Sequence, residues 1–191
     1  MRSAPDRWRF DKLRGHGWRV PLATRTARQP TGTRSSGLMV SSERLVALLR
    51  EVKGLAREYY ELTEKPLGVA GEIAEYEVAR ILKLELSRPR QSGYDAVREG
   101  DGKTELLQIK GRRLTPSSKA SQRIGSINLE KDWDVVILVL LDEHYEPTAI
   151  YEARRKAVKA ALSKPGSKAR NERGSLAVSQ FKAIGSQIWP S

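Results

Sequence analysis

Three polar side chains with complementary chemistry lie near the middle of the 191-residue sequence: Asp95, Gln108 and Lys110. Asp95 ends the segment GYD, and the other two residues are separated by one isoleucine in LLQIKG. A carboxylate and an amide supply oxygen atoms, the ligands that Mg²⁺ prefers. An amine beside such an ion could orient or deprotonate a water molecule. This combination is suited to hydrolysis of a phosphodiester, because the metal would stabilise the charge that develops.

A hairpin explains how these residues, distant in sequence, could meet. Asp101-Gly102 is a dipeptide favoured in two-residue turns, and the segments on both sides alternate between apolar and polar residues. Pairing outward from this turn sets Arg98 opposite Glu105, an opposite-charge pair that favours the register. The same register sets Asp95 opposite Gln108.

Side chains alternate along a strand, so the register also predicts which residues share a face. The carbonyl of Ile109 adds a third oxygen next to the acid and the amide. One face of the predicted hairpin carries Asp95, Val97, Leu106, Gln108 and Lys110.

The helix predicted after Pro66, running to about Leu84, carries a fourth candidate, Glu75. On a helical wheel Glu75 lies at the edge of the apolar arc, facing the core, whereas Glu72 points away from it. A partly buried carboxylate is costly unless it is paired or bound to a cation. Two interpretations remain open: a structural salt bridge to Lys110, or a place beside a metal ion. The arc itself consists of Ala70, Ala74, Val78 and Ile81.

These motifs resemble the PD-(D/E)XK nuclease superfamily: a helix with a glutamate (AEYEVARIL), then GYD, a turn, and LLQIKG on a strand. The D…QxK pattern is similar to Mrr-type restriction endonucleases, in which glutamine replaces the usual glutamate. The likeness covers residues 68–112 by motif, and the element order to about residue 162 is compatible. It implies Mg²⁺-dependent cleavage of DNA, less often of RNA, with Mn²⁺ as an alternative ion.

On this resemblance Asp95, Gln108 and the Ile109 carbonyl would bind the metal, Glu75 would help to hold it through water, and Lys110 would act in catalysis. Gln108 brings no negative charge, so weaker metal binding is expected than with glutamate. Basic residues that follow the motif could contact phosphates, or could be solvated surface charge: Arg112, Arg113, Lys119 and Arg123.

The remaining patterns predict the elements that position this site. An amphipathic helix is expected near residues 43–62, a buried central strand at WDVVILVLLD, another strand at PTAIYEA and a helix at RRKAVKAAL. A basic loop at 164–174 and a closing helix at 175–189 complete the chain. This order predicts an α/β fold with a central mixed β-sheet flanked by helices, as in restriction endonucleases.

Composition narrows the possible chemistry. The chain has no cysteine and only two histidines, His16 and His144, so a thiol nucleophile, a Cys-ligated zinc site and a Ser-His-Asp triad have no basis. Its longest apolar run, VVILVLL, is far shorter than the roughly 20 residues of a membrane helix. We therefore expect a cytoplasmic protein without a membrane partner.

Positive charge is concentrated in the first 38 residues. They contain nine Lys or Arg and two Asp, a charge of 9 − 2 = +7, which leaves +5 of the total +12 for residues 39–191. We interpret residues 1–38 as a disordered basic tail and residues 39–191 as a single nuclease-like domain. The tail could be a transit peptide, an arm that binds nucleic acid, or sequence upstream of a true start at Met39, which we favour.

Two other functions remain open beside a nuclease. The chain could bind nucleic acid, or regulate, without cleaving it, because basic charge alone supports phosphate contacts. It could also be a protein-interaction domain whose acidic and basic residues are merely structural. If it cuts both strands of a duplex, a homodimer is expected.

Overall fold

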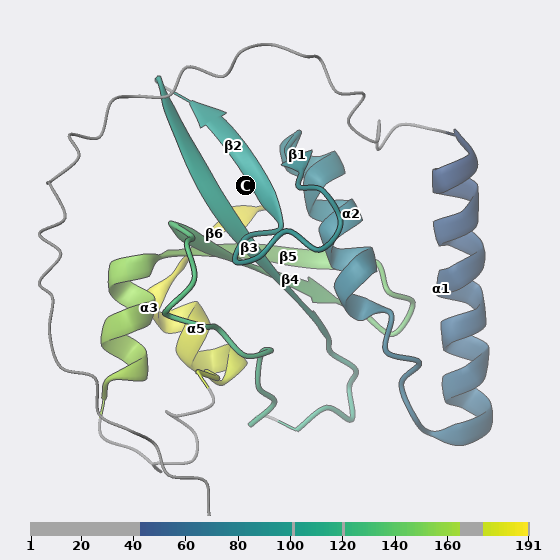
Figure 1. Ribbon diagram of the computed structural model, residues 1–191. Helices are drawn as coiled ribbons and strands as arrows, with labels where there is room; N and C mark the ends of the chain where they lie inside the picture. Colours follow the sequence, from purple (N-terminus) through teal and green to yellow (C-terminus); the bar gives the residue numbers. More distant parts are fainter. Residues whose placement is uncertain (1–42, 101, 120, 165–173, 191) are drawn as a thin grey trace, which may run out of the picture. The chain divides into compact units, whose positions relative to one another are not determined.

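The computed structural model describes residues 43–100, 102–119, 121–164 and 174–190, all within the unit Arg34–Ser191. They form a six-stranded mixed β-sheet flanked by helices, which confirms the predicted α/β class (Figure 1). The expected basic tail, Asp101 of the turn, and positions 165–173 of the basic loop lie outside the described residues. The helices are α1 (Glu43–Thr63), α2 (Ala70–Leu82), α3 (Arg155–Leu162) and α5 (Val178–Ile184). The strands are β1 (Glu85–Leu86), β2 (Ala96–Gly100), β3 (Lys103–Arg113), β4 (Val135–Leu141), β5 (Pro147–Arg154) and β6 (Ser186–Trp189).

The strands lie in the sheet in the order of the chain, and only β3 and β4 are parallel neighbours. The predicted hairpin register is confirmed, because β2 pairs with β3 with Arg98 opposite Glu105. Their side chains form an ion pair of 2.7 Å. The predicted central strand is also confirmed: every residue of β4 is buried, as expected for a strand covered on both faces.

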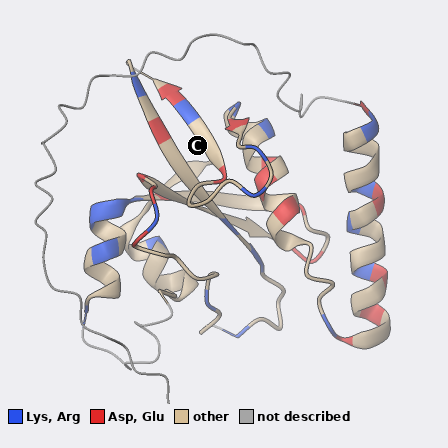
Figure 2. Ribbon diagram, in the orientation of Figure 1, with Lys and Arg blue, Asp and Glu red and all other residues tan. Residues whose placement is uncertain are grey.

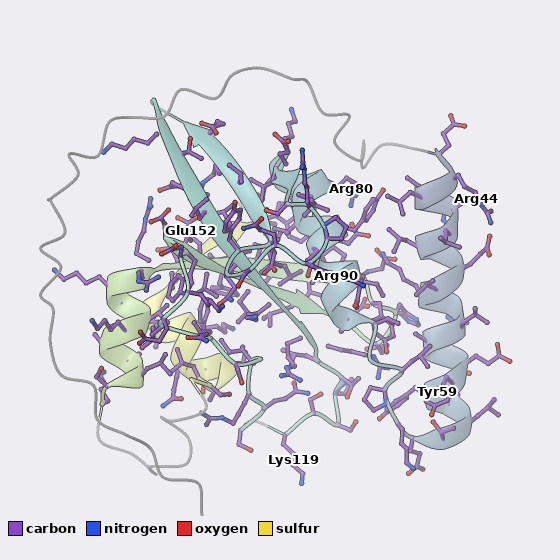
Figure 3. The ribbon with its side chains drawn as sticks, viewed as in Figure 1. Arg44, Tyr59, Arg80, Arg90, Lys119 and Glu152 are labelled. Carbon is purple, nitrogen blue, oxygen red and sulfur yellow. The ribbon has the colours of Figure 1, made fainter. Side chains whose placement is uncertain are left out.

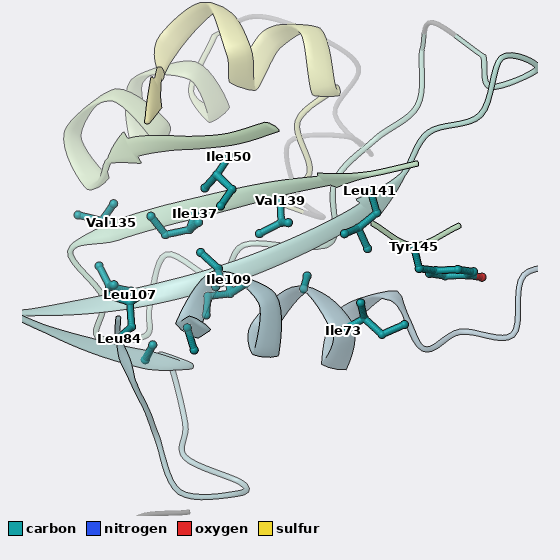
Figure 4. Packing of buried hydrophobic residues seen from close by; sticks show 14 of the residues in the cluster. Ile73, Leu84, Leu107, Ile109, Val135, Ile137, Val139, Leu141, Tyr145 and Ile150 are labelled. Carbon is teal, nitrogen blue, oxygen red and sulfur yellow. The ribbon is translucent and has the colours of Figure 1, made fainter. Parts of the chain in front are cut away.

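Helices cover both faces of the sheet. On one face α2 packs against β3 and β4, with Ile73 and Val78 meeting Leu107, Ile109 and aliphatic residues of β4 (Figure 4). On the other face α3 and α5 cover the alternate residues of β4 and β5. The alternation of strand side chains therefore gives each face its own hydrophobic cluster.

The first helix contributes less to the core than its apolar stripe predicts. In α1 only Ala56 is buried, whereas Leu48 is 42% exposed and Tyr59 39% exposed. Its basic and acidic residues are spread along the helix (Figure 2). Leu49 and Val52 are partly buried and pack against the core cluster with Ala56, so Leu48 and Tyr59 lie at the exposed margin of the apolar stripe. No described helix has the length and apolar character to cross a bilayer.

The end of the chain is only partly helical. The predicted closing helix is confirmed for α5, but the segment after Gly185 forms β6, which pairs with β5. A Cβ on Gly185 would lie 2.6 Å from the Glu152 carbonyl oxygen, so glycine permits the close approach to β5. The short strand β1 was not predicted either, because two residues carry no detectable alternation.

Candidate active site

The loop before β2 fixes Asp95 at the open end of the hairpin. Gly93 has φ +106°, and a Cβ there would lie 2.9 Å from the Asp132 carbonyl oxygen, so glycine is required on both counts. The Asp95 N–H donates to the Leu107 carbonyl (2.8 Å), and Asp95 Oδ2 accepts from the Ile109 N–H (2.7 Å). One carboxylate oxygen thus anchors β3, and Oδ1 has no hydrogen bond within the described residues.

Gln108 presents an unpaired oxygen beside this carboxylate. Its side chain is buried, and its Nε2 donates to the Gly93 carbonyl at 3.4 Å. Its Oε1 is buried without a hydrogen-bond partner in the described part of the chain, which is rare for a polar atom in a folded protein. The Ile109 carbonyl points to the same edge of β3 as its N–H, toward Asp95, because both backbone groups of a strand residue point the same way.

Lys110 lies half-buried in this group without a direct partner. Its side chain passes Gly125, where an added Cβ would be 3.5 Å from Lys110 Cδ. Burial lowers the pKa of Lys110, and the negative charges of Asp95 and Glu75 oppose that effect. Within the described part of the chain its amine makes no ion pair or hydrogen bond, so the alternative of a salt bridge to Glu75 is not formed.

The helix α2 brings Glu75 to the site by close contact with β3. A Cβ on Gly111 would lie 2.6 Å from the Ala74 Cβ, so only glycine allows the helix to approach this far. The pKa of Glu75 is raised from its usual 4.5 to about 7, chiefly by burial and also by the charges of Asp95 and Glu72, while the charge of Lys110 acts to lower it. The fold therefore brings Glu75, Asp95 and Lys110 within electrostatic range of one another.

The most deeply buried acid on α2 is Glu77, not Glu75, which corrects the helical-wheel interpretation. Glu77 is 4% exposed and accepts from Lys53 (2.7 Å) and Arg80 (2.8 Å), and Lys53 also contacts Glu146 (2.9 Å). Burial would raise the pKa of Glu77, but these hydrogen bonds outweigh it and lower the value. The wheel missed Glu77 because it considered only the sheet-facing arc, whereas α1 covers another side of α2. Glu77 is thus a structural residue.

The four predicted phosphate contacts have different surroundings. Arg112 is half-buried with an unpaired Nε, next to the candidate site. Arg113 donates to the Glu143 carbonyl (3.1 Å) and lies 4.3 Å from the centre of the Tyr60 ring. Arg123 donates to the side chain and backbone of Ser175. Lys119 is exposed and extends into solvent (Figure 3). Phosphate binding stays a prediction for all four, with Arg112 the best placed.

The donor set fits a hard divalent cation. Asp95 Oδ1, Gln108 Oε1 and the Ile109 carbonyl are all oxygen atoms at one edge of β3, and Gln108 Oε1 has no partner among the residues that the structure describes. A cation would also favour the ionised form of Glu75, whose pKa is raised by burial and by the nearby negative charges of Asp95 and Glu72. Among the described residues no three His, Cys, Asp or Glu side chains cluster in a metal-binding group, so the site relies on an amide and a backbone carbonyl.

Comparison with known proteins gave no match, either to a family model or to a curated sequence. The site is therefore interpreted from its own geometry and chemistry.

Sequence reasoning missed two features of this region. The close approach of α2 at Gly111 had a signal, because glycine inside a strand often marks a nearby backbone. Tyr145, whose buried hydroxyl has no hydrogen-bond partner within the described residues, had no such signal, since it lies 35 residues after Lys110 in a turn.

Proposed function

We propose that the protein is a Mg²⁺-dependent nuclease that hydrolyses phosphodiester bonds in DNA. The observation that carries the proposal is the meeting of Asp95, Gln108 and Lys110 at the end of the hairpin, with Glu75 beside them and no ion pair to Lys110. A structural cluster of this kind would be expected to pair its charges, as Glu77 does with Lys53.

Each residue has a separate task in this proposal. Asp95 Oδ1, Gln108 Oε1 and the Ile109 carbonyl hold the ion, which when bound stabilises negative charge developing on the phosphate. Glu75 orients water on the α2 side of the site. Lys110 directs the attacking water toward phosphorus. Because burial lowers its pKa, more of its amine is unprotonated near neutral pH and able to accept the proton that the water loses.

The order of elements supports membership of the restriction-endonuclease-like fold. The helix α2 precedes the hairpin β2–β3, and β4 follows parallel to β3, so the glutamate, the aspartate and the QxK segment occur in the order that the resemblance implies. Cleavage of both strands of a duplex would need a second copy of the site, so we propose a homodimer for that substrate. RNA is the less favoured substrate.

Cleavage assays test the proposal directly. Supercoiled, linear, branched and single-stranded DNA are incubated with the full chain in Mg²⁺, Mn²⁺ or EDTA. We expect the wild-type protein to give metal-dependent cleavage products. Lys110→Ala should give none, although it should still bind DNA in EDTA. Lys103→Ala is the matched control, because Lys103 lies at the opposite, exposed end of the same strand. Full activity of Lys110→Ala would overturn the assignment of that residue.

A second function, nucleic-acid binding without cleavage, is favoured by the neutral Gln108. One negative charge fewer should weaken metal binding and slow any reaction. This alternative predicts salt-sensitive binding of DNA with no metal-dependent product. Gel-shift and cleavage assays on the same preparation distinguish the two.

A further inference from the structure

A cleft opens beside the candidate active site, at the end of β3. Its volume is about 460 Å³, within the range of small-ligand pockets. Its walls come from the end of α1, the segment that leads to α2, the start of α2, the end of β3 with the segment after it, and the turn before β5. The lining residues that matter here are Ala70, Arg112, Arg113, Ser118, Gln122 and Tyr145.

Unpaired polar atoms are concentrated in this cleft. Six buried side-chain polar atoms lack a hydrogen-bond partner in the described part of the chain, and four of them belong to cleft residues. Buried polar groups are normally paired, so this concentration needs an explanation. The four atoms are Arg112 Nε, Arg113 Nε, Gln122 Oε1 and the Tyr145 hydroxyl.

Tyr145 is the most informative of these residues. It is 1% exposed, yet its hydroxyl contacts no donor or acceptor among the described residues. Its ring lies at the edge of the core cluster, and the hydroxyl points away from the labelled aliphatic side chains (Figure 4). A phenylalanine would fill the same space without leaving a polar atom unpaired. A ligand in the cleft would supply the hydrogen-bond partner that this hydroxyl lacks.

The unpaired donors favour an anion. Both arginine Nε atoms and the tyrosine hydroxyl can donate, and an amide rotation lets Gln122 donate as well. The helix α2 starts at Ala70 without a side-chain cap, so its first N–H groups add positive potential. Arg112 has no ion-pair partner within the described residues. Glu64, also in the lining, is the one opposing charge among the described lining residues.

We infer that this cleft binds a phosphate group of the nucleic-acid strand, next to the phosphate that would be cleaved. Arg112 and the Tyr145 hydroxyl are the principal contacts. Lys110 and Arg112 are two residues apart on β3, roughly 7 Å along the strand, so two phosphates of one chain can occupy the two sites. The position beside a cleavage site rests on the proposed function, but phosphate binding itself does not.

Binding without divalent metal tests this inference. The probes are inorganic phosphate and a fluorescent 12-nucleotide single-stranded DNA, with and without a 5′-phosphate, all in EDTA. We expect Arg112→Gln to weaken DNA binding about tenfold and to reduce the dependence of log K on log salt by about 0.7. Arg90→Gln is the control, since Arg90 is exposed and distant in sequence from the cleft. All variants contain residues 1–38, so any DNA binding by that segment does not affect the comparison between variants.

Tyr145→Phe gives the sharper outcome. It should weaken binding several-fold while the melting temperature stays equal or rises, because the variant removes an unpaired buried hydroxyl. Tyr59→Phe on the exposed side of α1 is its control. Preference for the 5′-phosphorylated DNA would identify a terminal phosphate as the ligand, and equal binding an internal one.

The inference is overturned if wild type binds none of these probes, or if both cleft variants bind like wild type. It is also overturned if Tyr145→Phe destabilises the protein without affecting binding. Every binding measurement is made in EDTA and so does not depend on cleavage. Binding that both cleft variants weaken, with no metal-dependent product in the separate cleavage assay, would contradict the proposed nuclease activity and not this inference.

Discussion

At the scale of single residues, Asp95 has a structural and a proposed catalytic role that can be separated. Its Oδ2 accepts from the Ile109 N–H, whereas Oδ1 is available to a metal ion. Asparagine can keep the hydrogen bond but loses the charge, and alanine loses both. The two substitutions therefore report on different properties of the same side chain.

We predict that Asp95→Asn and Asp95→Ala both abolish metal-dependent cleavage but differ in stability. Alanine leaves the Ile109 N–H unpaired and should lower the free energy of unfolding by about 1–3 kcal/mol, with a much smaller loss in asparagine. Urea denaturation and cleavage assays measure the two effects. Retained cleavage in Asp95→Asn would rule out Asp95 as a metal ligand.

Glu75 makes stability depend on pH. Its pKa is raised to about 7 in the folded protein, so the stability associated with its protonated form is present below about pH 4.5 and is lost as pH rises through 7. Burial is the largest cause of this raised pKa; the charges of Asp95 and Glu72 also raise it, and the charge of Lys110 lowers it. We therefore predict that Glu75→Gln is more stable than wild type at pH 8 in EDTA, with little difference at pH 4.

Melting temperatures of both proteins between pH 4 and pH 9 test this prediction. Mg²⁺ should reduce or reverse the advantage of Glu75→Gln at pH 8, because the ion favours the ionised carboxylate of wild type. Parallel pH curves for the two proteins would contradict the raised pKa.

At the scale of elements, the contact between α2 and β3 positions Glu75 relative to Lys110. That contact depends on Gly111, where a Cβ would lie 2.6 Å from the Ala74 Cβ. Helix and strand cannot both keep their places if this position carries a side chain. The hairpin itself depends less on the packing of α2, because its register follows from local pairing.

We predict that Gly111→Ala lowers the free energy of unfolding by about 1–3 kcal/mol or more and also reduces cleavage, since the helix must move away. Gly54→Ala is the matched control: Gly54 lies in the middle of α1 with nothing within 4 Å of the added Cβ. Replacing this helical glycine with alanine should raise the free energy of unfolding by about 0.5–1 kcal/mol. Equal effects of the two substitutions would show that the α2–β3 contact is not tight.

At the scale of the whole molecule, a real metal site must stabilise the folded chain. Ligand bound only to the folded state adds RT ln(1 + [L]/Kd) to the free energy of unfolding, about 2.7 kcal/mol at 100 times Kd. This property separates the proposed nuclease from a protein-interaction domain with purely structural charges.

We predict that Mg²⁺ and Mn²⁺ raise the melting temperature of wild type in a concentration-dependent way, and that Asp95→Asn loses most of the shift. Thermal-shift titrations against EDTA provide the measurement, with Na⁺ at equal ionic strength as the control. Absence of any shift up to millimolar Mg²⁺ and Mn²⁺ would favour the interaction domain.

The sequence by itself determined the hairpin, the central strand and the candidate acid, amide and amine. These features follow from local rules: a favoured turn dipeptide, strand alternation, and a run of apolar residues long enough to be buried. The register that sets Arg98 opposite Glu105 needed no information from distant parts of the chain.

Only the tertiary structure decided which charges are paired and which are left without partners. Glu77 and Glu75 are two residues apart on one helix, yet Lys53 from α1 pairs with the first, and Asp95 from the hairpin loop repels the second. Tyr145 and Arg112 likewise line one cleft built from separate segments. Burial and electrostatic energy depend on neighbours distant in sequence, so helical spacing and composition could not assign these roles.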